Sequence, residues 1–241
     1  MEPRLIPEKM RVFSGSGLKV LAVISMLIDH TGAFIVRQYP QVPLFTILGR
    51  TITLYKLMRT MGRIAFPLFA FLLVEGFLHT RDRLRYALRL GAFALLSEPA
   101  FDLVHCGKLL ELSSQNVFIT LFLGVLGLWA LERFRGKGWQ QLLCLLGLYA
   151  VALIARCDYG VTGYGFVLLL YLLREKPILR AIVGSGYLSS TWKAGLAFLP
   201  IAFYNGKRGF IRRRWLQYAF YLVYPVHLLI LYWIKRSLFG F

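Results

Sequence analysis

The chain has 241 residues, of which 58% are hydrophobic, and its mean hydropathy is +0.61. Soluble domains have about 45–50% apolar residues, so this composition excludes an ordinary soluble fold. The formal net charge is +18, from 29 basic and 11 acidic residues, which leaves two classes of protein: a nucleic-acid binder, or a membrane protein with basic loops on its cytoplasmic side.

The apolar residues lie in runs that approach the roughly 20 residues a helix needs to cross a bilayer. In chain order, we predict crossings at 17–37, 61–79, 86–104, 116–134, 139–156, 159–173, 178–190, 191–204 and 215–235. The sequence therefore predicts an all-α, polytopic membrane helix bundle of about nine transmembrane helices, with eight or ten as alternatives. The seventh and eighth runs are short, so a re-entrant pair or an incomplete crossing is the alternative there. No linker divides the chain, and we expect one domain over residues 1–241.

The basic residues gather in alternate connections. If the N-terminus is cytoplasmic, the inner segments hold Arg4, Lys9, Arg11, Lys19, Arg81, Arg83, Arg85, Arg89, Arg133, Arg135, Lys137, Arg174, Lys176, Arg180, Lys207, Arg208, Arg212, Arg213 and Arg214, which are 19 of the 29. This bias follows the positive-inside rule and predicts an inside N-terminus and an outside C-terminus. A nucleic-acid binder needs one continuous basic surface instead. We therefore expect membrane lipids and no nucleic acid as partners.

The segment 41–60 is the main exception to this charge pattern. It places Pro43, Arg50, Lys56 and Arg59 among apolar residues. Such a mixture predicts an amphipathic helix lying in the outer interface.

The start of the chain and the cysteines add little chemistry. The first apolar run is a full crossing without a small-residue cleavage site, so we expect no cleavable signal peptide. Cys106, Cys144 and Cys157 have no metal-ligand spacing, and we expect no metal site. Cys106 and Cys157 fall on the same predicted side; unlinked cysteines are favoured over a disulfide.

Polar residues inside the predicted helices are the informative ones, because a charged group at mid-membrane costs at least about 2.5–3.5 kcal/mol and normally faces a cavity or a partner. Most lie in the outer half of the predicted bundle, and two are deeper: Asp29, His30, Arg63, Glu98, Asp102, Gln115, Asn116 and Asp158, with Glu75 and His227. Any one of them could simply pair with another and hold helices together. Gathered at one depth, they predict an outward-facing polar cavity able to move a proton.

His30 is the expected general base of this cavity, because imidazole titrates near neutral pH. A carboxylate would orient it. Asp29 is adjacent but points about 100° away on a helix, so Glu98 from another helix is an equally good partner. The alternative is a buried imidazole bonded to a backbone carbonyl. His227 is either a second cavity residue or a packing residue beside Pro225, and His79 and His105 are expected at the surface.

Several strings together resemble the TraX family of bacterial membrane proteins. They lie in order at 18–20, 24–32, 62–71, 74–77, 96–102, 115–118 with Thr120, 158–160 and 224–227. The resemblance runs across nearly the whole chain. It implies a multi-pass protein of the bacterial cytoplasmic membrane, since members of the family are associated with N-terminal acetylation of a conjugative pilin subunit.

TraX proteins are also similar to the acyltransferase-3 superfamily, which moves acyl groups from cytosolic acyl-CoA to acceptors at the outer face. The resemblance implies acetyl-CoA as cosubstrate. The superfamily has an Arg eleven residues before its first-helix His, and here that position is Lys19, a candidate CoA contact. Lys19 and His30 would share a helix face about 16.5 Å apart, comparable to an extended pantetheine arm.

The resemblance therefore implies an acetyltransferase acting on an amine or hydroxyl of pilin, another surface peptide or a polymer. His30 would deprotonate the acceptor or carry the acyl group, and Arg63 or Asn116 would stabilise the oxyanion. The carboxylates Glu98, Asp102 and Asp158 would orient His30 or the acceptor. Two alternatives remain: a small proton-coupled transporter or flippase using the same charges, and a scaffold for assembling surface structures.

Overall fold

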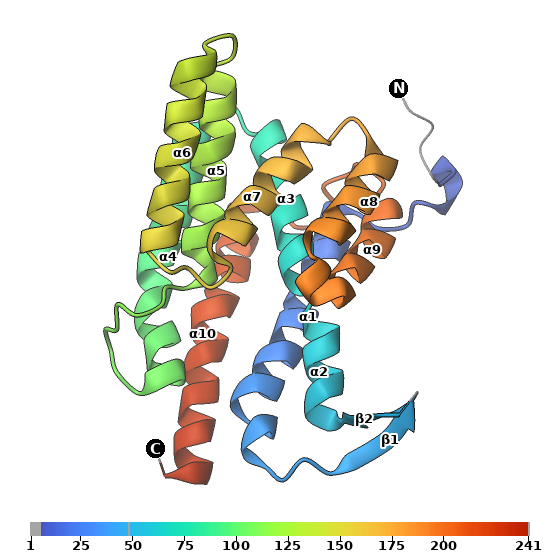
Figure 1. Cartoon of the computed structure of the whole chain (residues 1–241), viewed down its shortest axis with the longest axis vertical. Helices are drawn as coiled ribbons and strands as arrows, with labels where there is room; N and C mark the ends of the chain where they lie inside the picture. The colour runs from blue at the N-terminus through green and yellow to red at the C-terminus, as the bar shows by residue number, and fades with distance from the viewer. Residues whose placement is uncertain (1–5, 48, 241) are drawn as a thin grey trace.

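The computed structural model describes residues 6–47 and 49–240, and it is mostly helical (Figure 1). Its elements in chain order are η1 (Glu8–Met10), α1 (Gly15–Phe34), η2 (Val36–Gln38), β1 (Pro43–Ile47), β2 (Arg50–Thr53), α2 (Leu54–Gly62), α3 (Ala65–His79), α4 (Arg83–Cys106), α5 (Val117–Arg133), α6 (Gly138–Ile154), α7 (Gly160–Leu172), α8 (Pro177–Tyr187), η3 (Ser189–Ala197), α9 (Phe198–Ala202) and α10 (Arg214–Phe239), where η marks a 3₁₀ helix. Arg4, one of the predicted inner cations, lies outside the described residues.

Three helical stretches in the described part of the chain are long and apolar enough to cross a membrane. They cover Gly15–Gln38, Leu54–His79 and Trp215–Phe239, with mean hydropathies of 1.6, 1.7 and 1.3. The chain is therefore a helical membrane protein. Helix α4 is 24 residues long but carries Arg83, Arg85, Arg89, Glu98 and Asp102. The remaining predicted crossings coincide with shorter helices, and their number stays a prediction.

The surface of α6 supports a lipid environment. Ala152 is its buried residue, and large apolar side chains are exposed along it, including Leu143, Leu146, Leu153 and Ile154. An apolar helix surface of this size is unfavourable in water and compatible with hydrocarbon. We infer that this face of the bundle contacts acyl chains.

The predicted interfacial helix at 41–60 is wrong. Strands β1 and β2 form an antiparallel hairpin with a bulge near Pro43 and Gly49 at φ +72° in its turn. Helix α2 then begins at Leu54, capped by the Thr53 hydroxyl, which accepts from the Lys56 backbone N–H at 3.3 Å. This helix packs against α1, where Arg59 pairs with Asp29. The second apolar stretch therefore starts seven residues earlier than predicted.

The predicted eighth crossing, 191–204, is also not a membrane-length helix. This segment forms η3 followed by α9, which has five residues. A 3₁₀ helix has weaker hydrogen-bond geometry and rarely runs far, so the segment packs as a short connection beside α3 and α8. The re-entrant or incomplete crossing that the short run allowed agrees better with this arrangement.

The helices enclose one main apolar core, and their connections separate into two ends (Figure 1). Helix α4 packs against α5 and α10, and α1 against α2, α3 and α10. The α5–α6 and α7–α8 connections lie at the upper end in Figure 1, whereas the β1–β2 hairpin and the C-terminus lie at the lower end. The predicted inner loops therefore share one end of the molecule. Cys106, Cys144 and Cys157 are all free, as favoured from the sequence.

Candidate functional site

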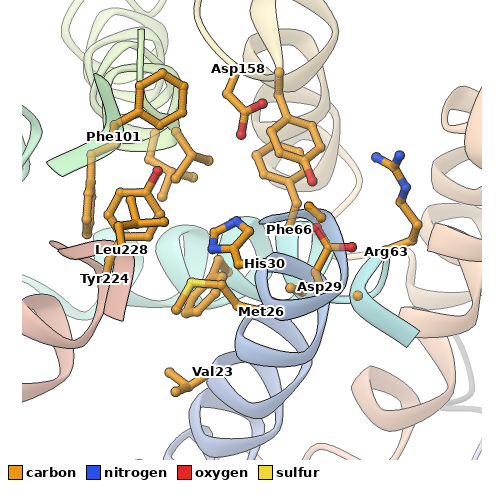
Figure 2. Close-up of a pocket in the computed structure, with 18 of the residues that line it drawn as sticks. Val23, Met26, Asp29, His30, Arg63, Phe66, Phe101, Asp158, Tyr224 and Leu228 are labelled. Carbon is orange, nitrogen blue, oxygen red and sulfur yellow. The ribbon is translucent and has the colours of Figure 1, made fainter. Parts of the chain in front are cut away.

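A cavity of about 690 Å³ runs between α1, α4, α10 and the α2–α3 pair. Its lining extends along α1 from Lys19 to beyond the helix end at Arg37, and along α10 from Gln217 to Lys235. The two ends of each stretch are 18 positions apart, or about 27 Å of helix, which is close to the hydrocarbon thickness of a bilayer. Polar residues thus line both ends of the cavity, and Figure 2 shows its middle.

His30 and His227 meet beside this cavity. Nδ1 of His30 lies 2.6 Å from Nε2 of His227, and the two rings are parallel within 5°. Nδ1 of His227 lies 2.8 Å from the carbonyl oxygen of Val223. A carbonyl can only accept, so His227 Nδ1 carries a proton, and in the neutral ring its Nε2 accepts. His30 Nδ1 then donates to His227, and His30 Nε2 is left with a free lone pair.

The two imidazoles differ in their exposure to the cavity. His30 is among the lining residues, whereas His227 is 7% exposed and lies behind it. Tyr224 meets both rings edge-on, with centroids 6.0 Å from His30 and 5.6 Å from His227. The arrangement presents one basic nitrogen to the cavity and holds it from behind, which is the geometry of a general base with an orienting partner.

Asp29 does not orient His30. Its carboxylate pairs with Arg59 of α2, also a lining residue. The position depends on Gly62: a Cβ there would come 2.1 Å from Asp29 Oδ1. Asp29 therefore joins α1 to the α2–α3 break, and among the described residues the hydrogen-bond partner of His30 is His227 instead of a carboxylate.

Glu98 and Asn116, which the sequence predicts as catalytic residues, lie outside the cavity lining. Asn116 is fully buried and caps α5, with its Oδ1 accepting from the Phe118 N–H at 2.9 Å. Its Nδ2 donates to the Ala94 carbonyl at 2.8 Å and to the Glu98 carboxylate. Both the nitrogen and the oxygen of the Asn116 side chain are already hydrogen-bonded, so the amide offers no donor to an oxyanion. The pair instead fixes α5 to α4.

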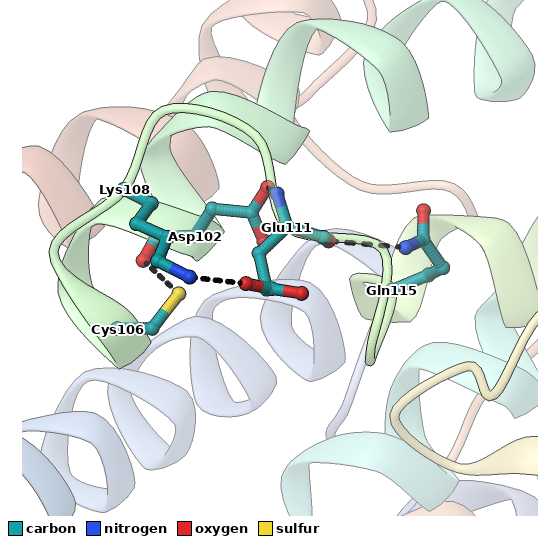
Figure 3. A network of polar contacts seen from close by, with 5 residues as sticks. All are labelled: Asp102, Cys106, Lys108, Glu111 and Gln115. Atoms are coloured by element: carbon teal, nitrogen blue, oxygen red, sulfur yellow. Dashed lines mark hydrogen bonds and ion pairs between the residues drawn. The ribbon is translucent and has the colours of Figure 1, made fainter.

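Asp102 also has a structural role. It is 2% exposed, and its Oδ2 accepts from the Glu111 backbone N–H at 2.8 Å, which holds the 107–115 loop against α4 (Figure 3). In that loop Lys108 donates to the Glu111 carboxylate at 2.9 Å, and this hydrogen bond lowers the pKa of Glu111. Asp102, which is predicted to orient His30 or the acceptor, is absent from the cavity lining.

Glu75 lies apart from the cavity as well. It faces the Tyr204 hydroxyl and the Arg180 guanidinium at the end of the bundle where the basic connections gather. This contact ties α3 to the segments that precede α10. The structure therefore does not place Glu75, a predicted cavity residue, in the cavity lining.

Asp158 and Arg63 do line the cavity, as predicted. Asp158 precedes α7, and its backbone N–H donates to the Gln115 carbonyl at 2.8 Å. Figure 2 shows its carboxylate directed into the cavity on the side of His30. Arg59 and Arg63 act electrostatically on both Asp29 and Asp158. Two cations and two carboxylates thus lie at the level of the histidine pair.

Three lining residues were missed or misplaced by sequence reasoning. Arg59 lies one helical turn before Arg63, a spacing that could have placed both on one face of a helix. Tyr159 stacks on Phe66 with centroids 3.7 Å apart. His105 is exposed, as expected, but it also lines the cavity. Tyr159 could not be singled out as a cavity residue from the sequence, because the chain contains many aromatic residues.

One end of the cavity is built by Lys19 and a basic loop. Lys19 lies 5.8 Å from the Phe220 ring and close to Arg208. The loop is tied to the start of α1, because the Ser16 hydroxyl donates to the Arg208 carbonyl at 2.8 Å and accepts from the Ile211 N–H at 2.9 Å. Lys19 and the basic loop therefore lie together at this end of the cavity.

The family model described as TraX protein matches residues 14–235. The matched range contains every residue that lines the cavity. The chain belongs to the TraX family.

A curated relative of this TraX-family chain is the probable fimbrial assembly protein FimC, serogroup H1, of Dichelobacter nodosus. It is 32% identical over 248 residues, which cover 91% of this chain and 94% of the relative. No solved structure matches the chain. The name of the relative connects it with fimbrial assembly.

Proposed function

We propose that this TraX-family protein is a membrane acetyltransferase that moves an acetyl group from cytosolic acetyl-CoA to an amine or hydroxyl at the outer face. The observation that carries the proposal is the cavity from Lys19 to Arg37, with the free nitrogen of His30 exposed between its ends. A base that lies between the two ends of a cavity suits a reaction whose two substrates come from opposite sides.

The donor would enter at the basic end. Lys19, Arg208 and the neighbouring loop cations suit the phosphates of CoA. His30 lies eleven residues further along α1, about 16.5 Å away. The lining between them includes Val23, Met26 and Tyr221, which suit a thin, largely apolar pantetheine arm. This spacing is also what supports a relation to the acyltransferase-3 superfamily.

His30 would act as general base. Its Nε2 takes a proton from the acceptor nitrogen or oxygen as that atom attacks the thioester carbonyl. The new carbon–nitrogen or carbon–oxygen bond forms, the carbon–sulfur bond breaks, and the CoA sulfur leaves with the proton from His30. An acetyl group carried on His30 is the alternative. Arg59 and Arg63 are the cations placed to stabilise the oxyanion, and Asp158 would orient the acceptor.

The acceptor we propose is a pilus subunit or another surface peptide or polymer. The name of the relative, a fimbrial assembly protein, supports a pilus subunit. We further propose that the protein crosses the bacterial cytoplasmic membrane several times, with the basic connections in the cytoplasm.

Replacement of His30 tests the reaction. Purified protein and its H30A and H79A variants would be incubated with labelled acetyl-CoA and an acceptor peptide. We expect His30→Ala to lower transfer by about 10²–10⁴-fold, as for loss of a general base. His79→Ala should leave it unchanged, because His79 is exposed and outside the cavity. Both variants should elute as folded protein.

The same assay separates the enzyme from a transporter. A cavity with polar residues at both ends also suits a transported solute, and a transporter would bind ligand without breaking the thioester. Undiminished transfer by the His30→Ala variant would refute the proposed mechanism. Absence of both transfer and thioester hydrolysis in the wild-type protein would favour transport.

A further inference from the structure

The outer mouth of the cavity is lined by cations. Arg37 comes from η2 and Lys235 from α10, and His105 of α4 lies near them. The lining residues beyond His30 in the outward direction, as far as the structure describes them, include no carboxylate. The two lining carboxylates, Asp29 and Asp158, lie at the level of the histidine pair. The outer part of the passage is therefore electropositive.

A second, smaller recess adds to this charge. It has a volume of about 320 Å³, shares His105 and Lys235 with the main cavity, and adds Arg236. Arg236 donates to the Tyr232 hydroxyl at 3.0 Å. Asp102 of α4 accepts from the 107–115 loop and lines neither cavity (Figure 3). The cations thus border a space that a ligand can occupy.

The position of these cations along the helices gives a distance. Helices α1 and α10 run in the same direction, since Lys19 contacts Phe220 at one level and His30 contacts His227 at another. Arg37 follows His30 by seven residues and Lys235 follows His227 by eight, which is about 10–12 Å of helix in each case. Two helices therefore place a cation at a similar depth outside the base.

We propose that the outer mouth binds an anionic group, a carboxylate or phosphate, that the acceptor carries about 10–12 Å from its nucleophilic atom. The inference rests on the acyl transfer proposed above and names a property of its acceptor. An acceptor that enters from outside passes Arg37, His105 and Lys235 before reaching His30. An anion held there leaves the nucleophile beside His30 Nε2. A neutral acceptor of the same length gains no such contact.

Matched peptide acceptors test this requirement. In an extended peptide 10–12 Å corresponds to about three residues, at 3.3–3.6 Å each. One peptide would have an N-terminal amine and Glu three residues further on, and its twin would have Gln there. We expect KM for the Glu peptide to be about three- to tenfold lower, as one or two partly screened ion pairs allow, with similar kcat. The preference should shrink as ionic strength rises.

Substitutions of Arg37 and Lys235 test whether the outer mouth causes the preference for the Glu peptide. A double variant with Arg37→Gln and Lys235→Gln should remove the difference between the peptides and keep transfer to the Gln peptide. Lys56→Gln is the matched control, because Lys56 is an exposed cation at the same end of the molecule that does not line the cavity. It should retain the preference.

The outcomes are distinguishable. Transfer by the wild-type protein with equal KM for the two peptides overturns this inference and leaves the acetyltransferase standing, whereas no transfer to either peptide counts against the acetyltransferase itself. The assay would be run in bilayers of zwitterionic lipid and again with anionic lipid. If anionic lipid abolishes the preference at constant ionic strength, the cations bind lipid headgroups and the inference is also overturned.

Discussion

The contact between His30 and His227 gives the two histidines different roles: His30 is the proposed base, and His227 orients it. The Val223 carbonyl keeps the proton of His227 on Nδ1. Because His227 Nε2 then accepts the 2.6 Å hydrogen bond, the proton of His30 lies on its Nδ1. A carboxylate partner would add a negative charge behind the base. An imidazole partner adds a hydrogen bond without a charge, so the pair can accept one proton and share it between two rings.

Replacement of His227 should therefore slow the reaction without weakening the binding of acetyl-CoA. In His227→Phe the Nδ1–H of His30 loses its acceptor, and we expect kcat to fall about 10²-fold with KM for acetyl-CoA within about twofold. His227→Gln offers an amide oxygen at a similar reach, so it should recover a large part of the rate. The measurement is steady-state kinetics of both variants.

The pH profile distinguishes positioning from a general loss of structure. If His227 shares the proton of His30, the acidic limb of kcat should move in His227→Phe, and His79→Phe should keep the wild-type profile. A uniform drop in rate with an unchanged profile, in a folded protein, would contradict the shared proton.

Sequence reasoning predicted the depth of the polar residues but not the direction in which they point. His30, Arg63 and Asp158 were predicted in the cavity and line it. Glu98 and Asn116 were predicted at the same depth, yet they face each other away from the cavity. Depth follows from counting residues along a predicted helix. The rotation of each helix about its axis depends on packing between helices, which a single sequence does not reveal.

At the scale of elements, the break between α2 and α3 is what brings Asp29 into the site. Helix α2 ends at Gly62, and the absence of a side chain there leaves room for the Asp29 carboxylate and its pairing with Arg59. After the break the chain continues from α2, which packs against α1, into α3, most of whose residues are buried. Gly62 thus allows α1 and α2 to pack closely and also allows the Asp29–Arg59 ion pair at the cavity.

A methyl group at this position should destabilise the fold. In Gly62→Ala the new Cβ would come 2.1 Å from Asp29 Oδ1, so Asp29 or α2 must move. Overpacking of this kind costs about 1–3 kcal/mol. We expect the midpoint of thermal unfolding in detergent to fall by several degrees, about 2–8 °C.

Gly147→Ala is the control for this change. Gly147 lies within α6, and a Cβ there would meet no atom within 4 Å. Because alanine favours a helix over glycine by about 1 kcal/mol, its midpoint should stay or rise. Equal midpoints for the two variants would show that Asp29 moves without cost.

Element boundaries were predictable where apolar runs are continuous and not where charge interrupts them. The prediction of 116–134 agrees closely with α5, and 139–156 with α6. The segment 41–60 mixes cations with apolar residues, and both a surface helix and a hairpin followed by a helix satisfy that pattern. The deciding contact, Arg59 with Asp29, joins residues 30 positions apart. Local pattern carries no information about it.

At the scale of the whole molecule, basic residues lie at both ends of the cavity. The basic loop at 207–214 lies beside Lys19 at one mouth, and Arg37 lies at the other. If the first mouth faces the cytoplasm, the donor and the acceptor reach His30 from opposite compartments. The proposed reaction therefore depends on the orientation of the bundle in the membrane.

Single cysteines measure that orientation. In a background with Cys106, Cys144 and Cys157 replaced by alanine, Ser113→Cys reports on the 107–115 loop and Arg135→Cys on the α5–α6 connection; both native side chains are exposed. We expect a membrane-impermeant maleimide to label Ser113→Cys in intact spheroplasts and Arg135→Cys only after lysis, because the positive-inside rule keeps the basic connections in the cytoplasm. The reverse pattern would place the Lys19 mouth outside, where acetyl-CoA is absent, and the acetyltransferase proposal would fail with it. Labelling of both sites in intact cells would mean that α5 does not separate two compartments, which contradicts the crossing predicted at 116–134.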